Sequence, residues 1–152
     1  MNFKVAIKTC LKEKYANFSG RASRSEFWFF YLFILVGYAI LLFLAFNVSF
    51  QFFWVFGIFV IGIILPGLGV LVRRLHDINK SGWFFLLPIP FDIVGRLLER
   101  SNGDISLVFT IISFGISIYL LILYCKDGDK KNNRFGKNIY KSKKKRKRAS
   151  SK

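Results

Sequence analysis

The stretch FWFFYLFILVGYAILLFLAF, residues Phe27 to Phe46, carries no Lys, Arg, Asp, Glu or His. About 20 consecutive apolar residues are enough for a helix to cross the hydrocarbon core of a bilayer, where backbone amides must bond within their own segment. The charge-free region continues to Val72 and is interrupted only by a short polar connection, residues 47–51. This pattern predicts an all-α integral membrane protein and excludes a disordered chain, a collagen-like chain and a small disulfide scaffold.

Two further segments, residues 52–72 and 105–125, are also long and apolar enough to cross. The segment 83–98 is a fourth candidate, but it reaches only about 24 Å as a straight helix and contains Pro88 and Pro90. We therefore expect four spans, at about 27–46, 52–72, 83–98 and 105–125, of which the third is short or broken by proline.

The net charge of +16 is distributed very unevenly along the 152 residues. If all four segments cross, all but two of the 24 Lys and Arg residues lie on one side of the membrane, the exceptions being Arg96 and Arg100. The positive-inside rule then predicts a multi-pass protein with both termini in the cytoplasm, and no cleavable signal peptide is recognisable before the first span. Asp92 can pair with Arg96 four residues later, although an intramembrane proton or ion site is the alternative interpretation.

Residues 1–20 have the pattern of a basic amphipathic helix. Apolar side chains recur at three- and four-residue spacing between lysines, at Phe3, Ile7, Leu11, Tyr15 and Phe18. Such a helix can lie in the headgroup region, or it can pack its apolar stripe against the protein's own spans, and the pattern fits both. Ser23 and Glu26 then form a capping box that starts the first span of the membrane domain, residues 21–125.

Residues 73–83 read RRLHDINKSGW and predict a polar cytoplasmic turn that re-enters the membrane at Trp83. His76 beside Asp77 is compatible with acid–base catalysis, but no nucleophile accompanies the pair, so a charged turn is the favoured interpretation. With one His and two unpaired Cys in the chain, we expect no metal and no cofactor. A further hypothesis is that carboxylates and arginines tie the two cytoplasmic elements into one cluster: Glu26 and Asp77 with Arg21, Arg24, Arg73 and Arg74.

Three ordered motifs, FSGRASRSEFWFF (18–30), RRLHDINKSGWFFLL (73–87) and NRFG (133–136), resemble those of the domain of unknown function 805 family. Members of that family are small bacterial inner-membrane proteins, so the resemblance implies an inner-membrane location but no catalytic residue, substrate or cofactor. The residues that carry the resemblance or belong to the cytoplasmic cluster are Gly20, Arg21, Arg24, Glu26, Trp28, Arg73, Arg74, His76, Asp77, Gly82, Trp83, Asn133, Arg134 and Gly136.

The tail, residues 126–152, is strongly basic and is expected to be disordered after about residue 140. Its run Lys143, Lys144, Lys145, Arg146, Lys147 and Arg148 is of the kind that binds anionic phospholipid, at about 1 kcal/mol per residue near the surface. Nucleic acid is the weaker interpretation because the tail is anchored beside an anionic membrane and has few aromatic side chains. The alternative interpretation is a solvated tail that binds no partner.

These features favour a non-enzymatic inner-membrane component. Its basic cytoplasmic face would engage anionic phospholipids of the bilayer, an unidentified protein partner or a second copy of the chain. A small transporter or channel subunit is the alternative function class.

Overall fold

The computed structural model describes residues 1–140, which form helices and loops with one isolated bridge pair, Asn133–Gly136. The all-α fold class is therefore confirmed for this part of the chain. In chain order the elements are α1 (Phe3–Lys8), the π-helix η1 (Thr9–Glu13), α2 (Arg24–Asn47), α3 (Phe52–Asp77), the 3₁₀-helix η2 (Gly82–Leu86), α4 (Pro88–Leu98) and α5 (Gly103–Cys125).

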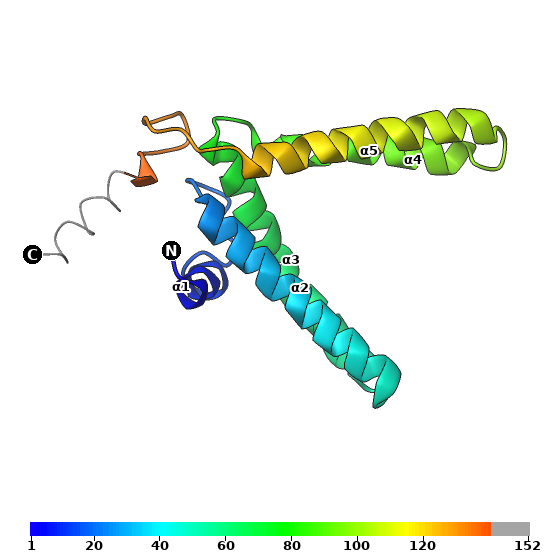
Figure 1. The fold of residues 1–152 in the computed structure, drawn as a ribbon, viewed down its shortest axis with the longest axis horizontal. Helices are drawn as coiled ribbons and strands as arrows, with labels where there is room; N and C mark the ends of the chain where they lie inside the picture. Colours follow the sequence, from blue (N-terminus) through cyan, green and yellow to red (C-terminus); the bar gives the residue numbers. More distant parts are fainter. Residues whose placement is uncertain (141–152) are drawn as a thin grey trace, which may run out of the picture.

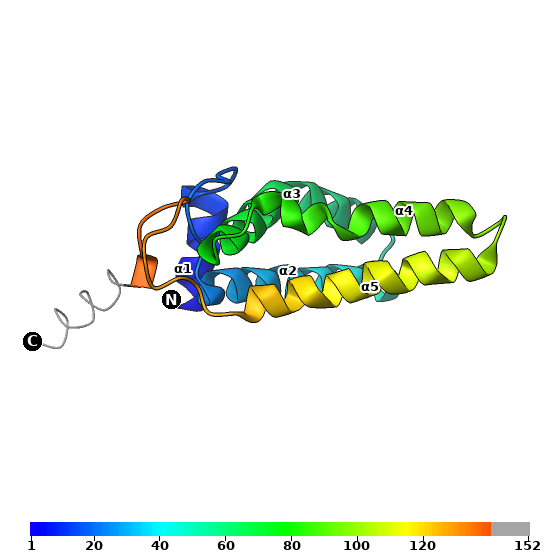
Figure 2. The same cartoon turned by 90° about the horizontal axis from the view of Figure 1, so that it is seen from above.

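The helices form two antiparallel hairpins that diverge like the arms of a V (Figure 1). One arm is α2 packed on α3, and the other is α4 packed on α5. The arms meet at a base that also holds the N-terminal helix and the segment after α5 (Figure 1). Seen from above, α3 and α4 form one layer while α2 and α5 form the other (Figure 2). Both ends of the described chain therefore lie at the base.

Three helices, α2, α3 and α5, are long and apolar enough to cross a membrane. Helix α3 continues past the predicted end at residue 72, so Arg73 to Asp77 form its last turn rather than part of a loop. The prediction of a loop at these residues was wrong, because their charged side chains form ion pairs inside the protein and do not have to be solvated by water. The helix ends just before Asn79, whose φ of 59° places it in the left-handed region that Asn tolerates at helix ends.

The proline-containing segment, which was predicted as a span at 83–98, is divided into two helices, η2 and α4. Pro88 stands in the first turn of α4, where its missing amide hydrogen is not needed, and the short helix η2 precedes it. Small residues allow α4 to lie close to α5, since a Cβ added to Gly95 would stand 3.3 Å from Thr110 Oγ1. The Ser113 hydroxyl donates to the Pro88 carbonyl at 3.2 Å. With 11 residues, α4 alone is too short to span a bilayer.

The N-terminal segment is less regular than the spacing predicts. The helical part ends at Glu13, with a π-helical second half; α1 packs on α2 and η1 packs on α3, and the buried residues of this part are Ala6, Thr9 and Cys10. The predicted apolar stripe is only partly buried: Leu11 packs against the core and Phe3 contacts Phe29 of α2, but Phe3 and Phe18 remain 41% and 40% exposed. The buried positions of this segment carry short side chains, whereas its larger apolar side chains stay partly exposed.

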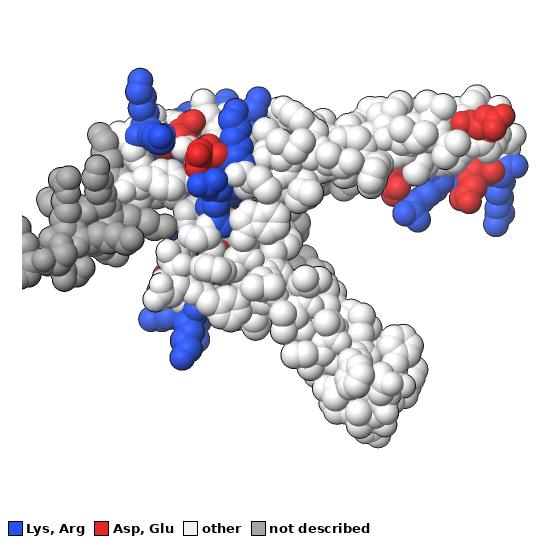
Figure 3. All heavy atoms as spheres, viewed as in Figure 1, with Lys and Arg blue, Asp and Glu red and all other residues white. Residues whose placement is uncertain are grey.

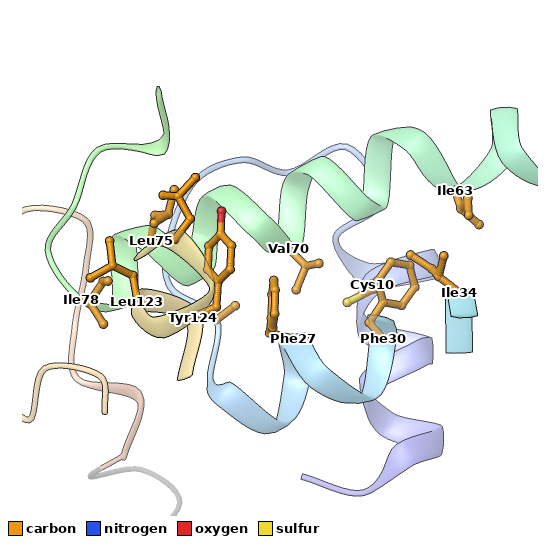
Figure 4. Packing of buried hydrophobic residues seen from close by; sticks show 12 residues of the cluster. Cys10, Phe27, Phe30, Ile34, Ile63, Val70, Leu75, Ile78, Leu123 and Tyr124 are labelled. Carbon is orange, nitrogen blue, oxygen red and sulfur yellow. The ribbon is translucent and has the colours of Figure 1, made fainter. Parts of the chain in front are cut away.

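The buried apolar core is concentrated at the base. Phe27 of α2 stacks on Tyr124 of α5 with ring centroids 4.9 Å apart, and Val70 of α3 is fully buried (Figure 4). Farther along the arms most large apolar side chains are exposed, as at Ile58 and Ile61, both 72%. The protein thus holds its two arms together at one end only and presents apolar surface along the rest.

Candidate functional site

A group of charged side chains lies buried at the base, where the two arms meet. We call it the base cluster and define it as Arg21, Glu26, Arg73, Arg74 and Asp77. Arg73, Arg74 and Asp77 have no exposed surface, and the other two side chains are nearly as buried. Charged side chains are seldom fully buried unless they are paired.

Asp77 is the centre of the cluster. Its carboxylate accepts from Arg21 Nε at 2.8 Å, from Arg74 Nη1 at 2.7 Å and from the Tyr140 hydroxyl at 2.5 Å. These three donors come from the loop before α2, from α3 itself and from the C-terminal segment. One carboxylate therefore connects three separate parts of the chain.

Glu26 and Arg73 form the second pair, at 3.2 Å between Glu26 Oε1 and Arg73 Nη2. Glu26 is held in the first turn of α2, which starts at Ser23 because the Ser23 hydroxyl accepts from the Glu26 amide at 3.4 Å. Arg73 also donates through Nη1 to the carbonyls of Lys14 and Asn17, so it ties the N-terminal loop to α3. Within the described part of the chain, Arg73 Nε is buried without a hydrogen-bond partner.

Arg74 and Arg21 also donate hydrogen bonds to backbone carbonyls at the end of α5 and in the segment that follows it. Arg74 Nε donates to the Tyr124 carbonyl at 3.0 Å, and Arg74 Nη2 donates to that of Lys126. Arg21 Nη1 donates to the Lys131 carbonyl at 2.8 Å. The last carbonyls of a helix have no intrahelical donors, and arginine is a suitable donor for them. These bonds hold the second arm and the following segment on the first arm.

The base cluster contains three guanidinium groups and two carboxylates, so it carries a positive charge within the protein. Paired and hydrogen-bonded charges of this kind tolerate burial, whereas removal of one partner costs about 3–5 kcal/mol. Burial and the nearby Glu26 carboxylate raise the pKa of the Cys10 thiol to about 12, which keeps it protonated and unreactive. Burial and the bond to Asp77 raise the pKa of Tyr140 to about 12, so its hydroxyl remains a donor.

His76 is held between the turn at Gly20 and the segment 133–136 by contacts of its ring and of its carbonyl. Its Nδ1 donates to the Gly20 carbonyl at 3.2 Å, and its ring lies flat on Phe135 with centroids 3.8 Å apart. Asn133 Nδ2 donates to the His76 carbonyl at 2.9 Å. Gly20 and Gly136 have φ values of 82° and 148°, which favour glycine. The role that these contacts support for His76 is positional.

Most of the sequence-predicted site residues meet at the base: Gly20, Arg21, Glu26, Arg73, Arg74, His76, Asp77, Asn133 and Gly136. The structure forms the hypothesised pairs of carboxylates and arginines for Arg21, Arg73 and Arg74, which contact Asp77 or Glu26. The hypothesis is wrong for Arg24, which instead pairs at the surface with Asp127 at 2.5 Å.

The remaining predicted residues surround the cluster without joining it. Trp28 contacts Phe27 edge-on, Gly82 lies against Val72, Trp83 is exposed, and the Arg134 guanidinium lies over Phe135. The predicted lipid-binding run, residues 143–148, lies outside the described residues.

Sequence reasoning missed three parts of the site that come from the C-terminal segment: Tyr140, the Lys131 carbonyl and Gly128. No motif around Tyr140 marks it as a site residue. A backbone carbonyl such as that of Lys131 cannot be recognised as an acceptor from any sequence. Gly128 is different, because the run Asp127-Gly128-Asp129 indicates a tight turn. A Cβ at Gly128 would collide with Asp77 and Tyr140, so the turn passes directly against the cluster. No group of three potential metal ligands occurs among residues 1–140.

The apolar arms and the buried ionic base define the class as a helical membrane protein. A family model described as "Protein of unknown function (DUF805)" matches residues 15–137, and the chain belongs to this family. The Inner membrane protein YhaI of Escherichia coli K12 is 29% identical over 125 residues, which cover 82% of this chain and 86% of YhaI. YhaI of Escherichia coli O157:H7 matches to the same extent. No solved structure matches.

Proposed function

We propose that the protein is a non-enzymatic component of the bacterial inner membrane with four crossings and both termini in the cytoplasm. Its basic cytoplasmic face, at the base of the V, binds the headgroups of anionic phospholipids. The single observation that carries this proposal is the distribution of charge: Glu26 and Asp77 are buried at the base, and of the Lys and Arg residues in 1–140 only Arg96 and Arg100 lie at the opposite end.

The third crossing is supported by the pairing of helices in the second arm. Helices η2 and α4 together extend about 27 Å, close to the hydrocarbon thickness of about 30 Å, and α4 runs beside α5. The second arm ends in charged residues, including the pair Asp92–Arg96 at 3.0 Å (Figure 3). Such a charged end is suited to the opposite membrane surface. An even number of crossings then places the C-terminal segment on the same side as the N-terminus.

The lipid-binding face is supported by what the acidic residues do. Glu26 and Asp77 pair with arginines inside the base cluster, and Asp127 pairs with Arg24. Few carboxylates are therefore left to neutralise the surface lysines. Lysines such as Lys4 and Lys12 are exposed beside the partly exposed Phe3, a combination typical of segments that lie in the headgroup region. Each such cation near an anionic surface contributes about 1 kcal/mol.

The proposal is tested by lipid selectivity in reconstituted bilayers. The full chain is placed in phosphatidylcholine bilayers that contain spin-labelled phosphatidylglycerol or spin-labelled phosphatidylcholine, and the motionally restricted fraction of each is measured. We expect phosphatidylglycerol to be enriched at the protein and the enrichment to fall as salt is added, because surface charges are screened.

A matched pair of double variants assigns the selectivity to one face. Lys4→Gln with Lys12→Gln removes two cations at the base, and Arg96→Gln with Arg100→Gln removes two at the opposite end. We expect the first pair to reduce the enrichment and the second to leave it unchanged. Equal effects of the two pairs, or the absence of any enrichment in the unmodified chain, would overturn the proposal.

A further inference from the structure

A cavity of about 500 Å³ lies where α3 and η2 meet the C-terminal segment. It is lined by Leu68, Val72 and Phe85 on the side of the arms, and by His76 and Ser81 on the side of the base. Its volume is within the range of small-molecule sites in proteins, which are mostly apolar with a few polar groups. The cavity therefore has an apolar part toward the bilayer and a polar part toward the cytoplasmic surface.

Two cations stand next in sequence to residues that line this cavity: Lys80 precedes Ser81, and Arg134 precedes Phe135. Arg134 Nη2 donates to the Asn79 carbonyl at 3.4 Å, and Lys80 is the next residue in the chain. Aromatic rings hold both groups, since Lys80 Nζ lies 5.4 Å from the Phe84 centroid and the Arg134 guanidinium lies 4.7 Å from that of Phe135. Neither cation forms an ion pair with any residue in 1–140.

The walls of the cavity are held in place by contacts that do not depend on a ligand. The His76 ring lies flat on Phe135, and its Nδ1 donates a hydrogen bond to the Gly20 carbonyl. Gly82 fits against Val72 so closely that a Cβ there would stand 2.7 Å from a Val72 methyl group. Trp83, at the mouth, is 76% exposed and is suited to the membrane interface. A preformed site loses less entropy when a ligand binds.

We infer that this cavity binds one anionic phospholipid, whose acyl chain enters between Val72, Trp83 and Phe85 and whose phosphate faces Lys80 and Arg134. This inference rests on the proposed function and deepens it: the basic face contains a defined lipid site in addition to its diffuse charge. Charge complementarity selects the lipid, because the apolar lining accepts a chain and two cations without an ion-pair partner neighbour the polar lining, within the part of the chain that the structure describes.

Trp83 lines the cavity and provides the readout. In a background with Trp28→Phe and Trp54→Phe it is the last of the three tryptophans of the chain. The full chain is reconstituted in phosphatidylcholine with a small, equal fraction of either phosphatidylglycerol or phosphatidylcholine that carries bromine on its acyl chains. Bromine quenches tryptophan fluorescence at short range. We expect brominated phosphatidylglycerol to quench Trp83 more strongly than brominated phosphatidylcholine at the same fraction.

Two charge variants separate the defined site from diffuse attraction. Lys80→Gln with Arg134→Gln removes the cations at the cavity, and Lys130→Gln with Lys131→Gln removes the same charge elsewhere on the base. We expect the first pair to lower the relative affinity for phosphatidylglycerol roughly fivefold per cation removed, and the second to change it little. Leu68→Phe, which fills part of the cavity without a change in charge, should also reduce the preferential quenching.

The outcomes distinguish the inference from the function on which it rests. If both charge pairs reduce the preferential quenching equally and Leu68→Phe has no effect, lipid attraction is diffuse and the site does not exist. If the unmodified chain shows no preference at Trp83 although spin-labelled phosphatidylglycerol is enriched at the protein, the inference alone is overturned. If neither experiment shows a preference for phosphatidylglycerol, both are overturned.

Discussion

The hydroxyl of Tyr15 replaces a backbone hydrogen bond that Pro66 removes from α3. Because Pro66 has no amide hydrogen, the carbonyl of Gly62 loses its usual donor four residues later in the helix. The Tyr15 hydroxyl donates to that carbonyl at 2.7 Å. This bond fastens the N-terminal segment to the middle of a long apolar helix, where an unsatisfied carbonyl is costly.

Tyr15→Phe should therefore lower the free energy of unfolding by about 1–2 kcal/mol, since it leaves the Gly62 carbonyl without that donor. In a Pro66→Ala background the same substitution should have almost no effect, because the amide of the new residue serves the carbonyl. Denaturant unfolding in detergent measures all four proteins of this cycle, and Tyr119→Phe, on the exposed side of α5, is the control. An equal loss in both backgrounds would contradict this explanation.

Asp77 should be the most sensitive carboxylate in the described chain. Asp77→Asn removes the charge that Arg21 and Arg74 share, so two guanidinium groups stay buried with weaker acceptors. We expect a loss of about 3–5 kcal/mol, seen as a large fall in the thermal midpoint in detergent. Asp92→Asn, in the exposed pair with Arg96, should change stability by less than about 1 kcal/mol. Similar losses for the two variants would show that the base cluster is not the main ionic support.

The two cysteines should differ in reactivity. Cys125 is exposed, whereas Cys10 is fully buried with its pKa raised to about 12, so Cys10 stays protonated even when pH is raised past about 8.5, where ordinary thiols ionise. Maleimide labelling of the folded protein in detergent should be rapid in Cys10→Ser and very slow in Cys125→Ser at neutral and mildly alkaline pH. Unfolding should remove the difference. Rapid labelling of Cys125→Ser in the folded state would show that the base opens readily.

The element that organises the molecule is the last turn of α3, because it contributes three members of the base cluster. Sequence patterning predicted the three helices that are long enough to cross, α2, α3 and α5, since a run of apolar residues identifies a membrane helix without tertiary information. It also suggested pairing between Glu26 or Asp77 and nearby arginines. It ended α3 too early because charge normally marks the point where a helix leaves the bilayer. Only the fold supplies the carbonyls and the Tyr140 hydroxyl that allow Arg74 and Asp77 to remain helical and buried.

The turn after α5 should tolerate no side chain at Gly128. In Gly128→Ala the new methyl group would overlap Asp77, which two arginines hold in place, so we expect a loss of about 1–3 kcal/mol. Gly57→Ala in α3 is the matched control because no atom lies within 4 Å of the added Cβ. Thermal unfolding of both variants in detergent compares them. A stability of Gly128→Ala equal to that of the control would mean that the turn does not rest on the cluster.

At the scale of the whole molecule, the structure consists of two apolar arms joined by a polar base. Hydropathy alone could predict the arms, and the count of basic residues could predict which ends lie together. The V shape could not be predicted, because it depends on how α2 and α5 meet at Phe27 and Tyr124 rather than on any local pattern. The arms separate beyond that contact since exposed apolar side chains in a bilayer need no protein neighbour.

The central claim is that the base faces the cytoplasm and that both arms cross the inner membrane. Its most direct test uses the chain with Cys10→Ser and Cys125→Ser, to which one cysteine is returned at a time by Gln51→Cys, Ser101→Cys, Ser81→Cys or Lys137→Cys. A membrane-impermeant maleimide is added to intact bacterial cells with a permeable outer membrane. We predict labelling at 51 and 101 in intact cells, and at 81 and 137 only after the inner membrane is opened. Protection of 101 together with labelling of 137 in intact cells would contradict the account, because the second arm would then cross only once.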